Sequence, residues 1–329
     1  MVSSPEQAAH GDGTRAAPSV TDGPGIGAVT VVVPAYNGGD ELLACLKSVA
    51  ASTYHPVRVV VVDNASIDGS VDDVARLLDA VELIRNATNL GFAAACNRGI
   101  QLAMDRDDAY VLLLNQDARV EPDAIAQLVD LARRLPRAAV IGAKTLSARQ
   151  STDGTHALLY NGAWRRGLPL WQKIPGIGRP DRGGEADPRE VDYVWGHGML
   201  LRTAALREVG LFDEEFFMYH EDLDLCMRIQ QAGWQAWCEP RSIIWHAVDD
   251  GPRAKHSQPW RWQMKVESAR HFHRKRYRPV RAECLWCATL LREAATLACE
   301  GHLQAFGHLL RAWGRSLSGG AANRDPRRD

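Results

Sequence analysis

Residues 29–37 read VTVVVPAYN, and this stretch decides the fold class. The β-branched run at 29–33 is typical of a strand buried on both faces, because such a strand needs apolar side chains on both sides. Pro34 is expected to end the strand, since proline has no N–H to donate to a sheet. The polar residues Tyr36 and Asn37 follow directly after it.

The same succession of strand and helix repeats from this stretch onwards. Strands are predicted at 57–62, 81–84 and 110–114, and helices at 40–51, 70–78, 92–104 and 122–135. Ser70 is expected to cap its helix, with Asp72 and Asp73 in the first turn. This alternation predicts an α/β fold with a Rossmann-like, mostly parallel sheet and helices on both faces.

Ligands of open sheets of this class bind beyond the carboxyl ends of the strands. The polar residues that follow the strands are therefore candidate ligand contacts: Tyr36, Asn37, Asp63, Asn64 and residues 115–117.

The pattern changes beyond residue 145. Residues 147–190 are rich in Gly, Pro and Arg and show no periodicity, so we expect a long loop there. Regular structure is expected again at 193–202, followed by helices at 204–209 and up to 229 and by strand-like pieces in 234–244.

The two ends of the chain differ in composition from the middle. Residues 1–27 are rich in Gly, Ala, Ser and Pro, which predicts a disordered tail, and 318–329 are expected to fray. Residues 1–27 contain no apolar run typical of a signal peptide, and no stretch of about 18 apolar residues could span a bilayer. The seven scattered cysteines fit reduced thiols, and Cys284 and Cys287 form C-x-x-C by coincidence on a helix. These features predict a cytoplasmic protein.

The total charge hides a local asymmetry. The chain holds 39 Lys and Arg against 40 Asp and Glu, and this balance argues against a nucleic-acid partner. Residues 251–281 alone contain ten basic residues and one acid, interleaved with aromatic side chains. This basic segment and the one or two helices predicted in 282–317 fit contact with an anionic membrane surface. The alternative is a solvated basic face with core helices behind it.

Six short motifs follow one another in a fixed order along the chain. They are VVVPAYN at 31–37, VVDNASIDGS at 61–70, NLGFAAACNRGI at 89–100, LLLNQDARV at 112–120, WGHGMLLR at 195–202 and FFMYHEDLDLCMR at 216–228. Together they resemble glycosyltransferase family 2, the inverting sugar-nucleotide transferases with the GT-A fold, and within it the bacterial rhamnosyltransferase type. The resemblance implies a GT-A domain over 28–250, with a nucleotide-binding half at 28–145 and an acceptor and catalytic half at 146–250. A basic, helical C-terminal extension over 251–317 follows it.

The resemblance implies a nucleotide pocket at the ends of the first strands. Asp63 would accept a hydrogen bond from the N3–H of uracil or thymine, which cytosine cannot donate, with Asn64 beside it. A turn residue is the alternative for Asp63. The other residues implied in binding the sugar nucleotide are Pro34, Tyr36, Asn37, Asn89, Gly91, Asn97, Arg98, Asn115, Gln116 and Asp117.

Asn115-Gln116-Asp117 occupies the place of the family's Asp-x-Asp motif. That motif holds a divalent cation, Mg²⁺ or Mn²⁺, against the diphosphate of the donor, and hard cations need oxygen ligands. Because Asn115 replaces the first acid, the resemblance implies that Asp117 is the retained metal ligand. His246 would be the second ligand, although a lone histidine after a strand is more often structural.

Glu221-Asp222 matches the family's Glu-Asp motif. Inverting transfer needs a carboxylate to deprotonate the acceptor hydroxyl as it attacks the sugar. Asp222 is expected to be this base, Glu221 the alternative base, and Asp224 a brace for the helix. Trp195, Gly196, His197 and Gly198 are the implied contacts of the sugar or the acceptor, with core packing as the alternative.

The resemblance therefore implies an inverting glycosyltransferase at the inner face of the cytoplasmic membrane. It would move a sugar, with L-rhamnose as one candidate, from a dTDP- or UDP-sugar to a hydroxyl of a glycan or polyprenyl-diphosphate-linked acceptor in cell-envelope biosynthesis. A sugar nucleotidyltransferase and a non-catalytic sugar-nucleotide-binding homologue are the alternatives. The sequence leaves open whether the chain forms a homodimer. Residues 258–262 fit the Q-x-x-R-W signature of processive synthases, which we attribute to coincidence or to an acceptor-side loop.

Overall fold

The computed structural model describes residues 27–78, 80–151, 153–166, 168–184, 186–247 and 259–318. Nearly all of the predicted N-terminal tail, most of the predicted C-terminal tail and Gln258 of the Q-x-x-R-W match lie outside the described residues.

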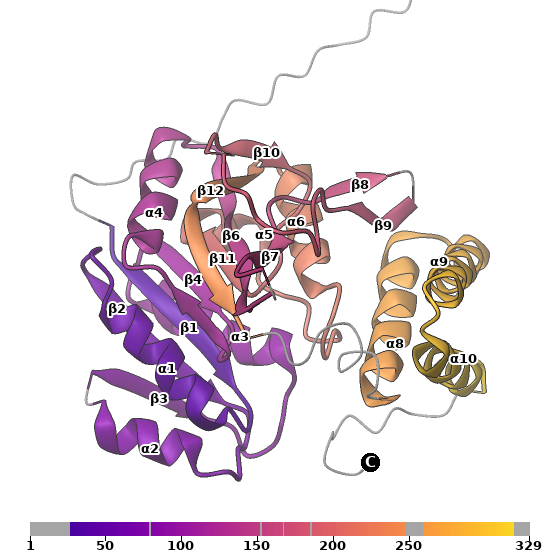
Figure 1. Ribbon diagram of the computed structural model, residues 1–329, viewed down its shortest axis with the longest axis horizontal. Coiled ribbons are helices and arrows are strands. Elements are labelled where there is room, and N and C mark those ends of the chain that lie inside the picture. Colours follow the sequence, from indigo (N-terminus) through magenta and orange to yellow (C-terminus); the bar gives the residue numbers. More distant parts are fainter. Residues whose placement is uncertain are drawn as a thin grey trace, which may run out of the picture.

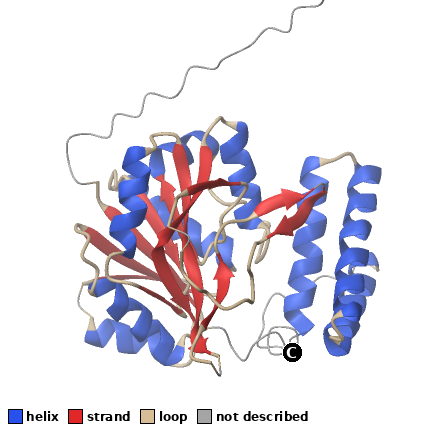
Figure 2. Ribbon diagram, turned by 45° about the horizontal axis from the view of Figure 1, so that its top comes forward, coloured by secondary structure: helices blue, strands red, loops and turns tan. Residues whose placement is uncertain are grey.

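A mixed sheet forms the centre of the molecule, with the strand order β10-β12-β6-β11-β4-β1-β2-β3 (Figures 1 and 2). Its strands are β1 (Val29–Ala35), β2 (Val57–Asp63), β3 (Val81–Arg85), β4 (Tyr110–Leu114), β6 (Ala138–Gln150), β10 (Arg189–Val191), β11 (Gly198–Arg202) and β12 (Gln235–His246). The pairs among β1 to β4 are parallel, and so is the pair of β6 with β12. β11 runs antiparallel between β4 and β6. The predicted α/β class is confirmed.

Shorter strands surround this sheet. β5 (Ala118–Val120) pairs with β12, and β7 (His156–Tyr160) pairs with β6. β8 (Trp164–Arg166) and β9 (Leu168–Lys173) form a separate hairpin. The prediction of one long loop at 147–190 was therefore wrong. These strands are only three to six residues long, which is too short for a pattern of alternating apolar residues to emerge from the sequence.

Helices cover both faces of the sheet. α1 (Gly39–Ala50), α2 (Ser70–Leu77) and α4 (Ala124–Arg134) contribute to one hydrophobic cluster, and α3 (Phe92–Asp105), α5 (Thr203–Val209) and α6 (Glu221–Gln231) contribute to the other. Neighbouring side chains of β1 enter different clusters, since Val31 and Val33 belong to the first and Val32 to the second. This burial on both faces explains the unbroken valine run.

Two local expectations near the first strands were wrong. β1 continues past Pro34, which pairs with Val62 of β2. Because β4 pairs with β1 only as far as Val32, the strand has one neighbour at Pro34 and the missing N–H is tolerated. Ser70 is the first residue of α2 rather than its cap, and the carboxylate of Asp68 accepts hydrogen bonds from its N–H and its hydroxyl.

The C-terminal extension consists of α8 (Pro259–Arg276), α9 (Pro279–Cys299) and α10 (Leu303–Leu317). α8 stands between the sheet domain and the outer helices α9 and α10 (Figure 1). The sequence predicted a helical extension with one or two helices in 282–317, but it did not give α8 as a separate helix. Its buried side chains Trp262, Val266 and Phe272 belong to the same hydrophobic cluster as the α3 side of the sheet. The extension therefore shares its core with the sheet domain.

Within the described residues, no helix is long and apolar enough to cross a membrane.

Candidate active site

Hydrogen bonds join the loops that follow β1, β2 and β4. The side chain of Gln116 accepts from the N–H of Tyr36 at 2.8 Å and donates to its carbonyl at 3.1 Å. The side-chain oxygen of Asn37 accepts from the N–H of Ile67 at 2.9 Å. These bonds bring the predicted nucleotide contacts of three strands together, and they give Gln116 and Asn37 a role in holding the loops.

Asp63 is the last residue of β2 and is 3% exposed. One of its carboxylate oxygens accepts from the N–H of Ser66 at 2.8 Å, which makes Asp63 a turn residue as well as a candidate ligand. The hydrogen bond fixes the carboxylate at the carboxyl end of the strand, where a base would bind.

Asn64 is buried and serves the protein itself. Its amide donates to the carbonyl of Gly91 at 3.1 Å and accepts from the side chain of Asn86 at 2.8 Å. Asn86 was missed by the sequence analysis, although it directly follows β3 and fits the same pattern of a polar residue after a strand. Arg98, which is exposed, donates to Asn86. Arg98 therefore lies beside this asparagine pair.

The remaining residues of the 89–97 motif shape the backbone. The side chain of Asn89 accepts from the N–H of Gly91 at 2.9 Å. Gly91 has a φ of 87°, and a Cβ there would lie 2.4 Å from the carbonyl oxygen of Phe217, so glycine is required. Asn97 is buried. Its side-chain oxygen accepts from the backbone N–H of Phe212 at 3.0 Å, and its side-chain nitrogen donates to the backbone carbonyl of Phe212 at 2.9 Å. These contacts connect the nucleotide half to the segment that leads into α6.

Asn115, Asp117 and His246 converge as the metal prediction requires. His246 Nε2 lies 3.1 Å from the side-chain nitrogen of Asn115 and 3.4 Å from Asp117 Oδ1. A carboxylate oxygen suits both Mg²⁺ and Mn²⁺, and an imidazole nitrogen is a ligand of first-row transition-metal ions. Among the described residues no third His, Cys, Asp or Glu joins them, so a bound cation would take further oxygen ligands from the donor diphosphate. The residues present fit a divalent cation.

The 195–198 motif lies between this pair and α6 (Glu221–Gln231), since the backbone N–H of Gly196 hydrogen-bonds to Asp222. The ring of His197 lies 5.2 Å from that of His246 and 5.4 Å from that of Trp195, and His197 Nε2 is 3.0 Å from the hydroxyl of Thr145. Gly198 lies in β11, where a Cβ would be 2.6 Å from Ile244. Because β6 lies between β11 and β12, the glycine leaves room for the side chain of Ile244, which reaches across β6. The partly exposed rings of Trp195 and His197 remain candidates for sugar contacts.

Glu221 and Asp222 open α6 and differ in their surroundings. Burial raises the pKa of Asp222 to about 6, although the backbone N–H groups of Leu223 and Gly196 favour the ionised carboxylate. Burial and the neighbouring Asp222 raise the pKa of Glu221 well above its usual value. At neutral pH Asp222 is thus ionised with raised basicity, whereas the raised pKa of Glu221 favours its protonated form. This difference favours Asp222 as the base.

A strained turn precedes these two carboxyl groups. Tyr219 and His220 have φ values of 73° and 68°, in the left-handed region that non-glycine residues rarely adopt. α8 packs against the turn, since Ser268 Oγ donates to the carbonyl of Met218 at 2.7 Å and Lys265 Nζ lies 5.6 Å from the ring centroid of Tyr219. The C-terminal extension therefore helps to hold the catalytic segment.

Glu221→Gln is expected to raise the thermal stability of the chain near neutral pH. Since the folded state retains a proton that the unfolded chain releases above about pH 4.5, the stability of the wild-type chain falls as the pH rises through that value. The neutral amide removes this loss. Thermal unfolding at pH 8 should show a Tm a few degrees above wild type, and the gain should vanish at pH 4. A lower Tm at pH 8 would contradict the assignment.

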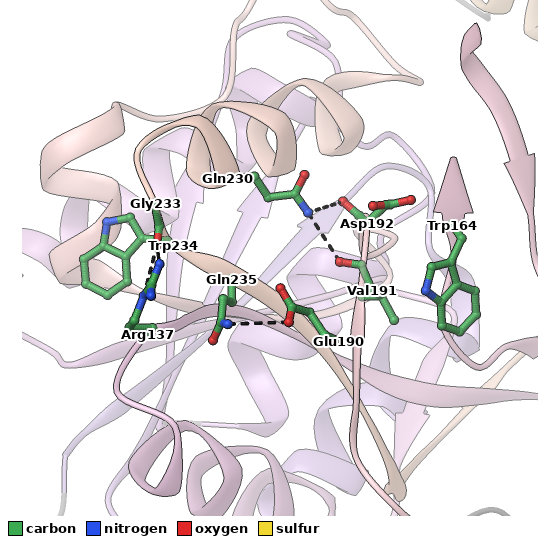
Figure 3. Close-up of a pocket in the computed structure, with 9 residues that line it drawn as sticks. All are labelled: Arg137, Trp164, Glu190, Val191, Asp192, Gln230, Gly233, Trp234 and Gln235. Atoms are coloured by element: carbon green, nitrogen blue, oxygen red, sulfur yellow. Dashed lines mark hydrogen bonds between the residues drawn. The ribbon is translucent and has the colours of Figure 1, made fainter. Parts of the chain in front are cut away.

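A hollow lies where α6 ends and β12 begins (Figure 3). Glu221 and Asp222 lie at the other end of α6. It measures about 380 Å³ and is lined by Arg137, Trp164, Glu190, Val191, Asp192, Gln230, Gly233, Trp234 and Gln235. The side chain of Gln230 donates to the carbonyls of Val191 and Asp192, and Arg137 donates to that of Gly233. The polar groups in Figure 3 thus serve the protein's own packing, and the hollow is not the active site.

Comparisons with known proteins identify the family of the chain. The sequence matches the family model described as "Glycosyl transferase family 2" over residues 30–210 and the one described as "Glycosyl transferase family group 2" over residues 184–314. It is 33% identical over 238 residues to the N-acetylglucosaminyl-diphospho-decaprenol L-rhamnosyltransferase of Mycobacterium tuberculosis, covering 66% of this chain and 75% of that protein. It is 25% identical over 204 residues to the low-salt glycan biosynthesis hexosyltransferase Agl10 of Haloferax volcanii, covering 62% of each.

Two solved structures are similar in fold. The mannosyltransferase PcManGT of Pyrobaculum calidifontis, in complex with GDP-Man and Mn²⁺, has a TM-score of 0.55 at 20% identity, covering 88% of this chain and 86% of that one. GalNAc-T7 with UDP, GalNAc and Mn²⁺ has a TM-score of 0.55 at 18% identity, covering 75% of this chain and about half, 51%, of that one. The order of the six motifs, the GT-A fold and the match over more than half of the sequence show that the chain belongs to glycosyl transferase family 2.

Proposed function

We propose that the chain is an inverting, metal-dependent glycosyltransferase that acts at the cytoplasmic face of the membrane. It transfers L-rhamnose from a dTDP- or UDP-sugar to a hydroxyl of a polyprenyl-diphosphate-linked glycan acceptor of the cell envelope. The observation that carries this proposal is the position of the Asp222 carboxylate, whose pKa is about 6. It accepts a hydrogen bond from the backbone of Gly196, and the ring of the next residue, His197, lies beside His246 of the Asp117–His246 pair. The choice of sugar and acceptor rests on the similarity to the mycobacterial rhamnosyltransferase.

The chain's own residues have distinct roles in this reaction. Asp63 accepts the imide N–H of uracil or thymine and so orients the nucleotide. Asp117 and His246 would hold a divalent cation, which as a Lewis acid stabilises the charge of the departing diphosphate. Asp222 takes the proton of the acceptor hydroxyl as its oxygen attacks the anomeric carbon from the face opposite the diphosphate. The bond to the diphosphate breaks as the new glycosidic bond forms.

A panel of sugar nucleotides tests the donor. Purified full-length chain with a polyprenyl-diphosphate-linked N-acetylglucosamine acceptor should release nucleoside diphosphate from dTDP-L-rhamnose or a UDP-sugar far faster than from GDP-mannose. Asp63→Asn should reduce this preference, because an amide can donate to a base that lacks the imide N–H. Release from the GDP-sugar alone would overturn the proposed role of Asp63, and consumption of a nucleoside triphosphate would indicate a nucleotidyltransferase.

Asp117→Asn is expected to weaken binding of the cation and of the donor together. The exchange replaces the charged ligand of the pair by a neutral amide beside His246. We therefore expect the affinity for Mn²⁺ to fall by about 10- to 100-fold. Titration of Mn²⁺ by electron paramagnetic resonance, with and without donor, reads the cation without reference to turnover. Unchanged Mn²⁺ binding in the variant would exclude Asp117 as a ligand.

A further inference from the structure

The outer helices α9 and α10 carry more than half of the exposed large apolar side chains of the described residues. Nine such side chains are exposed, and five of them lie on these two helices, with exposed fractions of 43% to 80%. They are Val280 and Leu291 on α9 and Leu303, Leu310 and Leu317 on α10. Scattered exposed leucines are ordinary, but such a concentration on two helices indicates a contact surface.

Each helix presents these residues on one face. On α10 the leucines at 303, 310 and 317 are seven residues apart, so they share a face, while Leu309 and Ala312 are buried on another face. On α9 the exposed residues Val280, Cys284 and Leu291 form a second line in the same way. We call these two lines the apolar stripes. They lie on the helices farthest from the sheet domain (Figure 1).

The basic residues of α8 do not form this surface. Arg270 and Arg274 form ion pairs with Glu283 of α9, at 3.0 and 2.7 Å, within the extension itself. Lys275 and Arg276 pair with Asp224 of α6 at 3.1 and 2.5 Å. These four cations are thus paired within the protein.

Arginines flank the apolar stripe of α10 instead. Arg311 and Arg315 are exposed and donate hydrogen bonds to His308 Nδ1 and Gln263 Oε1. In the part of the chain that the structure describes, neither makes an ion pair with a carboxylate. Glu300 is the exposed acid of this region, in the turn between the two helices. The surface around the leucines is therefore cationic.

This charge pattern decides between two occupants. A second copy that covered the stripe about a two-fold axis would bring the same arginines toward each other, which is unfavourable. An anionic lipid surface takes the leucines into its apolar layer and the arginines at its head groups. We propose that α9 and α10 dock the protein on an anionic lipid bilayer, with both helices lying in the plane of the interface. The proposal rests on the exposed side chains and does not depend on the proposed sugar transfer.

Vesicle binding tests this docking without donor or acceptor. The full-length chain should co-sediment with vesicles of phosphatidylcholine and phosphatidylglycerol and bind pure phosphatidylcholine more weakly. The triple variant Leu303→Gln, Leu310→Gln, Leu317→Gln should lose about tenfold or more in partitioning. The double variant Arg311→Gln, Arg315→Gln should lose the preference for phosphatidylglycerol. The matched control is Ile67→Gln with Leu77→Gln, two residues that are 73% and 58% exposed on the sheet domain, and it should bind like wild type.

Two further measurements keep the outcome clear. Thermal unfolding shows whether the triple variant is folded, and Leu303→Gln alone, at a residue 74% exposed, replaces it if it is not. Light scattering coupled to gel filtration reads the mass in solution. Equal vesicle binding by wild type and triple variant would overturn the proposal, as would a dimer that the leucine changes dissociate. Loss of vesicle binding with sugar transfer to a short soluble acceptor retained would separate docking from catalysis.

Discussion

Asp222→Asn is expected to lower kcat by about 10²–10⁴-fold with little change in the binding of the sugar nucleotide. The amide occupies the same space but cannot accept the proton of the acceptor hydroxyl. Because the pKa of Asp222 is about 6, the wild-type rate should fall below that pH as the base becomes protonated. The residual activity of the variant should lack this fall. Steady-state kinetics from pH 5 to 8 and donor binding by calorimetry measure both effects.

Glu221→Gln is the control for this experiment. The two carboxyl groups are neighbours on α6, so a general disturbance of the helix would affect both variants alike. Because burial and the neighbouring Asp222 raise the pKa of Glu221, its protonated form is favoured, and the neutral amide variant should therefore retain most of the activity. If Glu221→Gln were inactive and Asp222→Asn active, Glu221 would be the base.

Asp224→Asn is expected to destabilise the chain by about 3–5 kcal/mol. Asp224 is wholly buried and accepts from Arg228 at 2.9 Å, Lys275 at 3.1 Å and Arg276 at 2.5 Å. Removing this negative charge leaves Arg228 and Arg276, which are largely withdrawn from water, without their carboxylate partner, while Lys275 keeps Asp213 at 2.6 Å. Urea unfolding at constant pH measures the loss. The prediction that Asp224 braces its helix agrees with these contacts, which also bind α8 to α6.

Asp130→Asn is a matched control, because Asp130 pairs with Arg134 four residues later at the same distance of 2.9 Å. Both side chains of that pair are half exposed, at 56% and 50%, so the loss there should be about 0.5 kcal/mol or less. Similar losses in the two variants would show that burial does not set the strength of the Asp224 network.

Local pattern predicted the sheet and the main site residues. The valine run of β1 and the polar residues after β2 and β4 were enough to locate Asp63 and Asp117, because strand direction and topology decide where such residues meet. The same rule applied to β3 would have found Asn86. The sequence pattern could not show that the side-chain amides of Asn64 and Asn97 donate hydrogen bonds to backbone carbonyls, since those carbonyls lie in other loops.

Contacts between distant segments escaped prediction. α8 is buried on several sides, so its residues show no simple apolar face in the sequence. Its cations pair with acids far away in the sequence, so the sequence does not show that they form ion pairs. Lys275 lies 51 residues beyond Asp224. A sequence gives the excess of positive charge in this segment but not the carboxylates that neutralise it. The apolar stripes of α9 and α10 were hidden for a related reason, because exposed and buried leucines look alike until packing is known.

The left-handed turn at Tyr219 and His220 has a consequence for the synthesis of the chain. Residues of this kind cost on the order of 1–3 kcal/mol each, and they persist when their surroundings hold them. Here Ser268, made 50 residues after Met218, supplies part of that hold. A chain emerging from the ribosome therefore completes its nucleotide-binding half long before its catalytic turn is secured. A product terminated early, before α8, would lack this bond and the two cations of α8 that pair with the buried Asp224.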